Sequence, residues 1–227
     1  MALGTPETMR LQTYTKKSAK GSFMNKTDYK KELKQFYAAK VGKPAVVQVP
    51  RMYFIMVDGK GDPNTSQEYI DAVQTLYPVA YTIKFTSKLK YGQDFGVMPL
   101  EGLWWTENMA DFSAENKDNW LWTAMIMQPD VVTEDLYNQA VQQVRDRKSP
   151  KSLDKLRFAS YDEGRAAQVM YVGPYADEGP TIQELHKFIE EQGGRLDAGN
   201  KHHHEIYMGD PRRTAPDKLK TIIRQPY

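Results

Sequence analysis

The stretch MYFIMVDGKGDPNTSQEYIDAVQTLY, residues 52–77, joins a β-rich run, a turn of Gly, Asp and Pro, and a helical pattern. The same order returns in AAQVMYVGPYADEGPTIQELHKFIEEQGG, residues 166–194. In the first helix an apolar stripe runs from Tyr69 to Ile83, and Pro78 inside it is expected to kink the helix without ending it. The two stretches predict two copies of one strand–turn–helix unit.

Further β-like runs extend each unit. Two follow each helix, and a short one precedes each unit as its expected hairpin partner. A helix at 133–147, with Thr133 as its N-cap, joins the halves. The predicted fold is α+β: duplicated β-α-β-β modules, about 45–128 and 157–227, form one curved antiparallel sheet with helices on one face and a ligand cleft on the other. The additional runs are 45–49, 96–105, 120–127, 157–161, 202–208 and 220–227.

Composition excludes several classes of protein. The 227 residues carry a net charge of +2, and Lys and Arg are scattered, which argues against a nucleic-acid partner. The chain has no cysteine, so disulfides and thiolate chemistry are excluded and a cytoplasmic protein is expected. No apolar run approaches the roughly 18 residues of a membrane helix. We expect a monomer or a weak homodimer.

Residues 1–23 differ from the rest because they lack apolar periodicity and mix Thr, Lys, Ser and Gly. We interpret them as a leader or disordered arm outside the fold. The helical pattern NKTDYKKELKQFY follows Met24 directly. Residues 24–227 are therefore expected to form a single domain.

The stretch HHHEIYM, residues 202–208, raises the question of a metal site. Successive strand side chains alternate between faces, so His203, Glu205 and Tyr207 share one face. Adjacent histidines cannot converge on one ion, and His202 with His204 would lack a third ligand, so no metal is expected. Assigning the neighbouring apolar residues to the helix-covered core leaves Glu205 and Tyr207 on the open face.

Tryptophans concentrate on the predicted central strands. Trp104 and Trp105 point to opposite faces, whereas Trp120 and Trp122 share a face. Each of these side chains, taken alone, suits the core. As a set beside a carboxylate, they indicate a pocket for a planar aromatic ligand.

Three motifs together resemble the GyrI-like small-molecule-binding family. They are MPLEGLWW (98–105), VGPYADEGPTIQEL (172–185) and HHHEIYMGDPRRTAPDKLKTIIRQP (202–226), and the resemblance covers most of residues 24–227. It implies two β-α-β-β modules of the SHS2 type with a ligand cleft between them. Relatives in the family serve as effector domains of multidrug-responsive regulators and as antagonists of gyrase poisons. Some stand-alone members are cyclopropanoid cyclopropyl hydrolases, which open the cyclopropane of cyclopropylpyrroloindole-type DNA-alkylating compounds.

The resemblance favours such a detoxifying hydrolase without a cofactor. Its motifs place the acidic residue on Glu205, a base whose pKa burial is expected to raise, with Tyr207 or Tyr171 as hydrogen-bond donor. One alternative is a non-catalytic protein that binds lipophilic cations, with Glu205 as counter-ion. A weaker one is an interaction protein for a partner such as gyrase. The candidate ligand-binding residues are Trp104, Trp105, Trp120, Trp122, Tyr69, His203 and Glu101.

Overall fold

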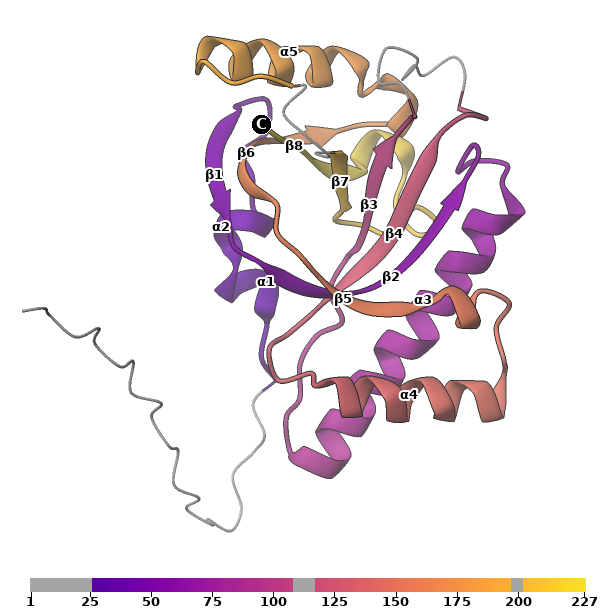
Figure 1. Cartoon of the computed structure of the whole chain (residues 1–227). Helices are drawn as coiled ribbons and strands as arrows, with labels where there is room; N and C mark the ends of the chain where they lie inside the picture. The colour runs from indigo at the N-terminus through magenta and orange to yellow at the C-terminus, as the bar shows by residue number, and fades with distance from the viewer. Residues whose placement is uncertain (1–25, 108–116, 197–201) are drawn as a thin grey trace, which may run out of the picture.

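The computed structural model describes residues 26–107, 117–196 and 202–227. The leader predicted at 1–23 lies outside them. One curved antiparallel sheet of eight strands forms the centre, in the order β1-β6-β8-β7-β3-β4-β2-β5 (Figure 1). This confirms the predicted α+β fold with a single curved sheet. The strands are β1 (Ala45–Val49), β2 (Met52–Lys60), β3 (Leu100–Trp105), β4 (Leu121–Gln128), β5 (Arg157–Tyr161), β6 (Gly164–Val172), β7 (His203–Tyr207) and β8 (Lys220–Pro226).

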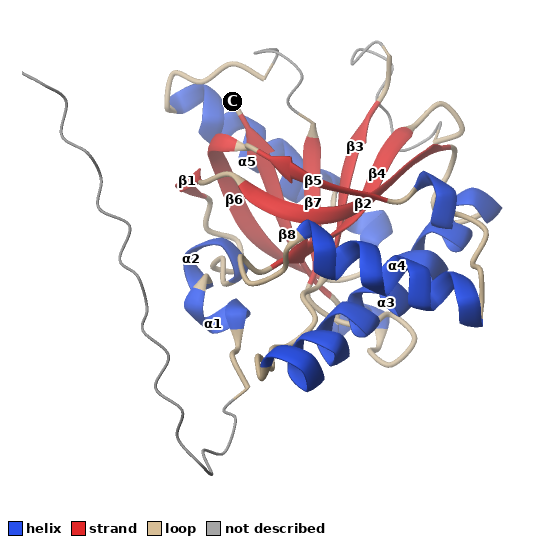
Figure 2. Ribbon diagram, turned by 60° about the horizontal axis from the view of Figure 1, so that its bottom comes forward, coloured by secondary structure: helices blue, strands red, loops and turns tan. Residues whose placement is uncertain are grey.

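Three longer helices lie along the outer side of the curved sheet, as both views show (Figures 1 and 2). They are α3 (Gln67–Thr86), α4 (Glu134–Arg147) and α5 (Gly179–Glu191). The α3 helix continues through Pro78, as predicted, and Thr133 caps α4 by accepting a hydrogen bond from the Leu136 N–H. Among the described residues, no helix combines the length and apolarity needed to span a membrane.

The strand order maps onto itself when each strand is exchanged for its counterpart in the other half. When β1 is exchanged with β5, β2 with β6, β3 with β7 and β4 with β8, the result is the same strand order read from the opposite edge of the sheet. The central contact of this pseudo-symmetry is the pairing of β3 with β7.

The two short strands, however, do not pair within their own halves. The β1 strand pairs with β6, and β5 pairs with β2. The hairpin partners expected from the sequence are therefore wrong. Each short strand directly precedes its own unit in the sequence. This position does not determine which half of the sheet the strand pairs with.

The sheet has an apolar layer on both faces. Ile223 pairs with Glu205 and packs with Leu185 and Ile189 of α5, so Glu205 lies on the outer, helix-covered face. The adjacent Ile206 lies on the inner face and is fully buried there. The parity within β7 was predicted correctly, but its assignment to faces was wrong, because buried apolar residues line both sides of the curved sheet.

The short helices α1 (Tyr29–Glu32) and α2 (Lys34–Tyr37) precede β1, and α2 buries Phe36 and Tyr37. The charged helical pattern after Met24 thus forms two single turns. Tyr37 is buried and donates a hydrogen bond from its hydroxyl to Glu101. Gly102 and Leu100, on either side of Glu101, pair with Glu205 and Tyr207 and face outward, so Glu101 faces inward. The segment before β1 therefore belongs to the core.

Candidate functional site

The Glu205 carboxylate is the centre of a polar cluster on the outer face. The Tyr207 hydroxyl donates to its Oε2 atom at 2.6 Å, and His203 Nε2 donates to its Oε1 atom at 3.2 Å. The Glu205 side chain is 13% exposed, so it remains accessible from solvent. Three side chains that share a face by strand alternation thus act as one unit.

The pKa of Glu205 is lowered, in contrast to the raised value expected from its sequence context. Burial by itself would raise the pKa. Hydrogen bonds from His203, Tyr207 and Glu178 stabilise the charged form and outweigh burial. Glu205 is therefore ionised at neutral pH.

An aromatic wall adjoins this carboxylate. The ring centroid of Tyr69, on α3, lies 5.6 Å from that of Trp104 and 5.1 Å from that of Trp122. The ring centroids of Trp120 and Trp104 are 5.6 Å apart. Trp104 and Trp122 form a cross-strand pair between β3 and β4, and Trp104 also pairs with His203. The structure thus brings these four aromatic residues together with Glu205, Tyr207 and His203.

Glycine at position 102 makes room for this wall. Gly102 lies opposite Glu205 in the β3–β7 ladder, and a Cβ there would lie 2.7 Å from Trp104 Nε1. The indole ring of Trp104 therefore occupies the space that a side chain at position 102 would fill.

Two residues of this cluster escaped the sequence reasoning, namely Glu178 and Tyr175. Tyr175 packs edge-on against Tyr207 with ring centroids 5.5 Å apart. Glu178 is buried at the N-terminus of α5, where its carboxyl makes no capping hydrogen bond. A glutamate in a Gly- and Pro-rich turn looks like a surface or capping residue in sequence. Only the buried position of Glu178 beside β7 and β8 distinguishes it from such a residue.

Unpartnered polar atoms also gather on this face. Six buried side-chain polar atoms in the described part of the chain have no hydrogen-bond partner, and five of them belong to residues in or beside the cluster. Buried polar groups are normally satisfied, so this concentration indicates a place where water or a ligand binds. The five atoms are Trp104 Nε1, Trp122 Nε1, Glu178 Oε1, His186 Nε2 and Thr221 Oγ1.

Glu101 and His204 belong to a different, inner-face network. Both ring nitrogens of His204 contact carboxylates, Nε2 with Glu101 at 2.9 Å and Nδ1 with Glu163 at 2.8 Å. Arg224 donates to the other Glu163 oxygen at 2.8 Å. The two carboxylates and two cations balance one another, and all four side chains are almost fully buried. Glu101 therefore lies away from the ligand-binding candidates of the outer face.

Burial opposes each charge of this network, but its partners outweigh the penalty. The carboxylates of Glu163 and Glu101 raise the pKa of His204 to about 9, and His204 with Arg224 lowers the pKa of Glu163 to about 2. His204 is therefore an imidazolium that donates from both nitrogens, which leaves no lone pair to bind a metal.

The remaining predicted residues lie apart from Glu205. Trp105 alternates to the inner face and stacks on His202 at 4.1 Å. The Tyr171 hydroxyl donates to the Pro174 carbonyl at 3.0 Å. The three adjacent histidines thus have three different environments, and the prediction that no metal is required stands as a prediction.

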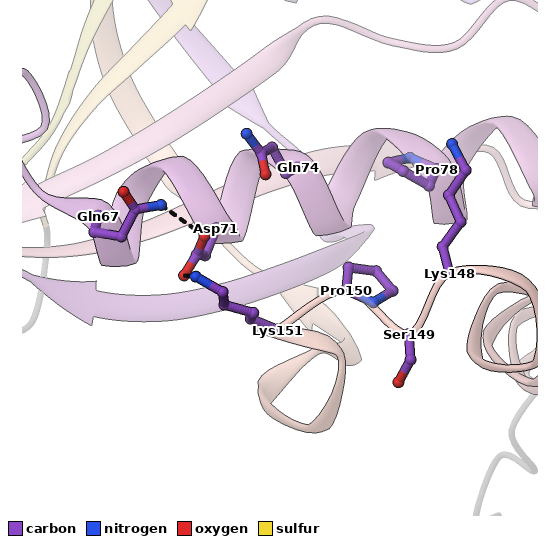
Figure 3. A pocket seen from close by; sticks show the side chains of 8 residues that line it. All are labelled: Gln67, Asp71, Gln74, Pro78, Lys148, Ser149, Pro150 and Lys151. Atoms are coloured by element: carbon purple, nitrogen blue, oxygen red, sulfur yellow. Dashed lines mark hydrogen bonds and ion pairs between the residues drawn. The ribbon is translucent and has the colours of Figure 1, made fainter.

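A surface pocket of about 500 Å³ lies between α3 and the segment after α4 (Figure 3). It is lined by polar side chains and prolines, and it contains none of the predicted site residues. Lys151 forms an ion pair with Asp71 across it at 3.4 Å. Its lining lacks the aromatic surface of the outer-face cluster.

Comparisons with known proteins identify a family and similar structures. The sequence profile of the GyrI-like small molecule binding domain matches residues 42–227. An uncharacterized conserved protein from Listeria innocua is 46% identical, with a TM-score of 0.82 over 88% of this chain and 99% of that chain. A hydrolase from Listeria innocua is 44% identical, with a TM-score of 0.79 over 89% and 99%.

A more distant structure shares the fold alone. The C-terminal domain of EcmrR is 13% identical, with a TM-score of 0.50 over 81% of this chain and 96% of that domain. A search of curated proteins found no match.

Proposed function

The chain belongs to the GyrI-like small-molecule-binding family, and from that premise we propose that it is a hydrolase for planar, lipophilic aromatic compounds. Its proposed substrates are DNA-alkylating toxins of the cyclopropylpyrroloindole type, whose strained cyclopropane it opens with water. The observation that carries this proposal is the ionised, accessible Glu205 beside an aromatic wall and five unpartnered buried polar atoms. The similar hydrolase from Listeria innocua supports a hydrolytic reaction.

Glu205 is the proposed general base. Its carboxylate accepts a proton from water as the water oxygen attacks the cyclopropane methylene. The ring bond breaks, its electron pair passes through the conjugated dienone to the carbonyl oxygen, and that oxygen becomes a phenolate. The phenolate takes up a proton, so the product contains one added water. A strained substrate needs mainly positioning, which a base and a flat aromatic surface supply.

The hydrogen bonds refine the roles of the tyrosines. Because the Tyr207 hydroxyl already donates to Glu205, we give Tyr207 the role of orienting the base. The Tyr171 hydroxyl is likewise engaged, with Pro174. The indole N–H groups of Trp104 and Trp122 have no acceptor among the described residues, and they are our candidates to stabilise the developing phenolate.

A second candidate function is sequestration of lipophilic cations. It is favoured by one observation: Lys117 Nζ lies over the Trp120 ring, 5.0 Å from its centroid. The wall therefore already accommodates a cation on an aromatic face. In that case Glu205 is a counter-ion and no bond is broken.

One experiment separates the two functions. The protein is mixed with a cyclopropylpyrroloindole compound in large excess, and the products are followed by mass spectrometry. A hydrolase converts the whole excess to the hydrated ring-opened product, whereas a sequestering protein retains about one equivalent and leaves the remainder unchanged. Recovery of unchanged compound from every complex would contradict the hydrolase proposal.

A further inference from the structure

Glu178 is a buried carboxyl group that helix capping does not explain. It is 3% exposed and occupies the N-cap position of α5, but its side chain makes no capping bond. Its Oε1 atom is buried without a hydrogen-bond partner among the described residues. A glutamate that served the helix would direct its oxygens at the free N–H groups of the first turn. Glu178 instead directs its carboxyl toward β7 and β8.

The Glu205 carboxylate is the principal partner of Glu178. The two carboxyl groups lie close enough to share a hydrogen bond. Because a carboxylate has no hydrogen to donate, such a bond requires that one of the two groups carries a proton. Two facing carboxyl groups that share a proton are a recognised device for separating acidic and basic roles.

The surroundings favour Glu178 as the carrier of the proton. Glu205 receives hydrogen bonds from Tyr207 and His203, which stabilise its charge. Burial, followed by repulsion from the Glu205 carboxylate, raises the pKa of Glu178 from 4.5 to about 9. The Thr221 hydroxyl and, to a smaller extent, the positive charge of Lys117 act against this rise in pKa, but their effect is outweighed.

We propose that Glu178 and Glu205 are a proton-sharing pair in which Glu178 holds the proton, orients Glu205 and limits the site to one negative charge. This deepens the proposed function, and its statement about ligands rests on that function. A site with one negative charge suits a neutral electrophile or a monocation, and it does not favour a dication. Glu178 is a positioning residue, since it acts through Glu205.

Other titratable groups face this pair and define what a pH experiment must separate. On β7 these are His203 and Tyr207, and Tyr69 of α3 adjoins Tyr207. Tyr171, Tyr175 and Lys117 interact electrostatically with Glu178. Burial raises the pKa of each of these four tyrosines above its ordinary value of 10.0, so none of them is ionised near pH 9.

The proton is observable without any ligand. Infrared spectroscopy at pH 7 should detect a buried protonated carboxyl group in the parent protein, and this band should disappear on titration through about pH 9. Glu178→Gln should remove the band. Glu184→Gln, which alters an exposed glutamate of the same helix, should leave it unchanged. Absence of the band from the parent at pH 7 would overturn the proposal, whatever the protein does to substrates.

The pH profile of turnover tests the positioning role. The side-chain amide introduced by Glu178→Gln can still donate to Glu205, so this variant should keep the rate at pH 7 within about threefold of the parent. It should also lose the inflection near pH 9 that the parent and Glu184→Gln show. Glu178→Ala removes the donor, so turnover should fall about 10- to 100-fold and the acidic limb should move to higher pH.

Equal losses in Glu178→Gln and Glu178→Ala, or an inflection that persists in Glu178→Gln, would contradict the pair. If no cyclopropanoid is hydrolysed by the parent, the proposed function fails, while the infrared titration still decides whether Glu178 holds a proton. The same titration applies to the protein as a cation binder. The two failures are therefore distinguishable.

Discussion

His203 and His204 are neighbours on β7, yet they join polar clusters of opposite character. His204 joins a closed inner network in which both ring nitrogens and both Glu163 oxygens are bonded. His203 contacts Glu205 in an outer cluster that is partly accessible and surrounded by unpartnered polar atoms. The inner network has balanced charges, and the outer cluster has an excess of negative charge.

The difference favours a structural role for the inner network and supports the proposed function of the outer cluster. A buried polar network that satisfies every member fixes a single arrangement of the strands it joins. A cluster with orphaned donors and acceptors has a cost in stability that function can explain. Residue type does not distinguish the two, since both contain Glu, His and Tyr. The completeness of the hydrogen bonding does.

The largest expected effect on activity comes from Glu205→Gln. Removing the charge and basicity should lower turnover of a cyclopropylpyrroloindole by roughly 10²–10⁴-fold while the fold is retained. Steady-state kinetics and a melting curve measure both. If the protein sequesters cations instead, affinity for a lipophilic cation should weaken by about 1–3 kcal/mol. A variant that behaves like the parent in both assays would remove Glu205 from the site.

Whereas Glu205→Gln should mainly lower turnover, Arg224→Met should mainly lower stability. It leaves an uncompensated carboxylate in the inner network, so the free energy of unfolding should fall by about 3–5 kcal/mol. Urea denaturation measures the loss. Arg212→Met is the matched control, because Arg212 forms an exposed pair with Asp210 and should change stability by less than about 0.5 kcal/mol. A similar small change in both variants would show that the inner network contributes little.

Gly102→Ala tests how tightly the aromatic wall is built. The added methyl group would displace the Trp104 ring, so we expect a loss of about 1–3 kcal/mol in stability together with weaker ligand binding. Gly179→Ala serves as the control, because no atom lies within 4 Å of a Cβ built there. Calorimetry and a binding titration would report the two effects. Unchanged binding in Gly102→Ala would place the ligand away from Trp104.

The two clusters should also differ in how stability depends on pH. Glu163, with a lowered pKa of about 2, contributes stability above its ordinary 4.5 that is lost as pH falls through about 2. His204, with a raised pKa of about 9, contributes stability below 6.5 that is lost as pH rises through about 9. The inner network therefore stabilises most between about pH 4.5 and 6.5.

Glu178 acts in the other direction because its raised pKa disfavours the charged form in the folded state. Between 4.5 and about 9 the folded protein holds a proton that the unfolded chain releases, so stability falls as pH rises. Glu178→Gln should thus gain stability over the parent at pH 8 and not at pH 4. The slope is at most about 1.4 kcal/mol per pH unit for one proton. Urea unfolding at the two pH values checks it, and equal differences would contradict the raised pKa.

Sequence patterns predicted the helices and strands better than they predicted the environment of the side chains on them. The alternation in HHHEIYM placed His203, Glu205 and Tyr207 on one face, because strand geometry fixes parity. Which face that is depends on the curvature of the sheet and on α2, whose Tyr37 contacts Glu101 on the inner side. Ile206 is apolar and buried in either case, so it could not decide between the faces.

The proposed role of Glu178 could not be predicted from the sequence for a related reason. The burial of one carboxyl depends on the packing of α5 against β6 and β8, which no local pattern encodes. Glu101 was expected to resemble Glu205 through the duplication. Its side chain points inward, because Gly102 and not Glu101 is the residue opposite Glu205.

The exchange of β1 and β5 between the halves has a consequence for how the chain folds. Ala45 pairs with Gln168, and Met52 pairs with Tyr161, so each half completes its edge only after the other half has been synthesised. Contacts between residues so distant in the chain impose a high contact order and slow folding. We therefore expect neither half to fold by itself, and a chain cut between α4 and β5 should regain its structure only when both fragments are mixed.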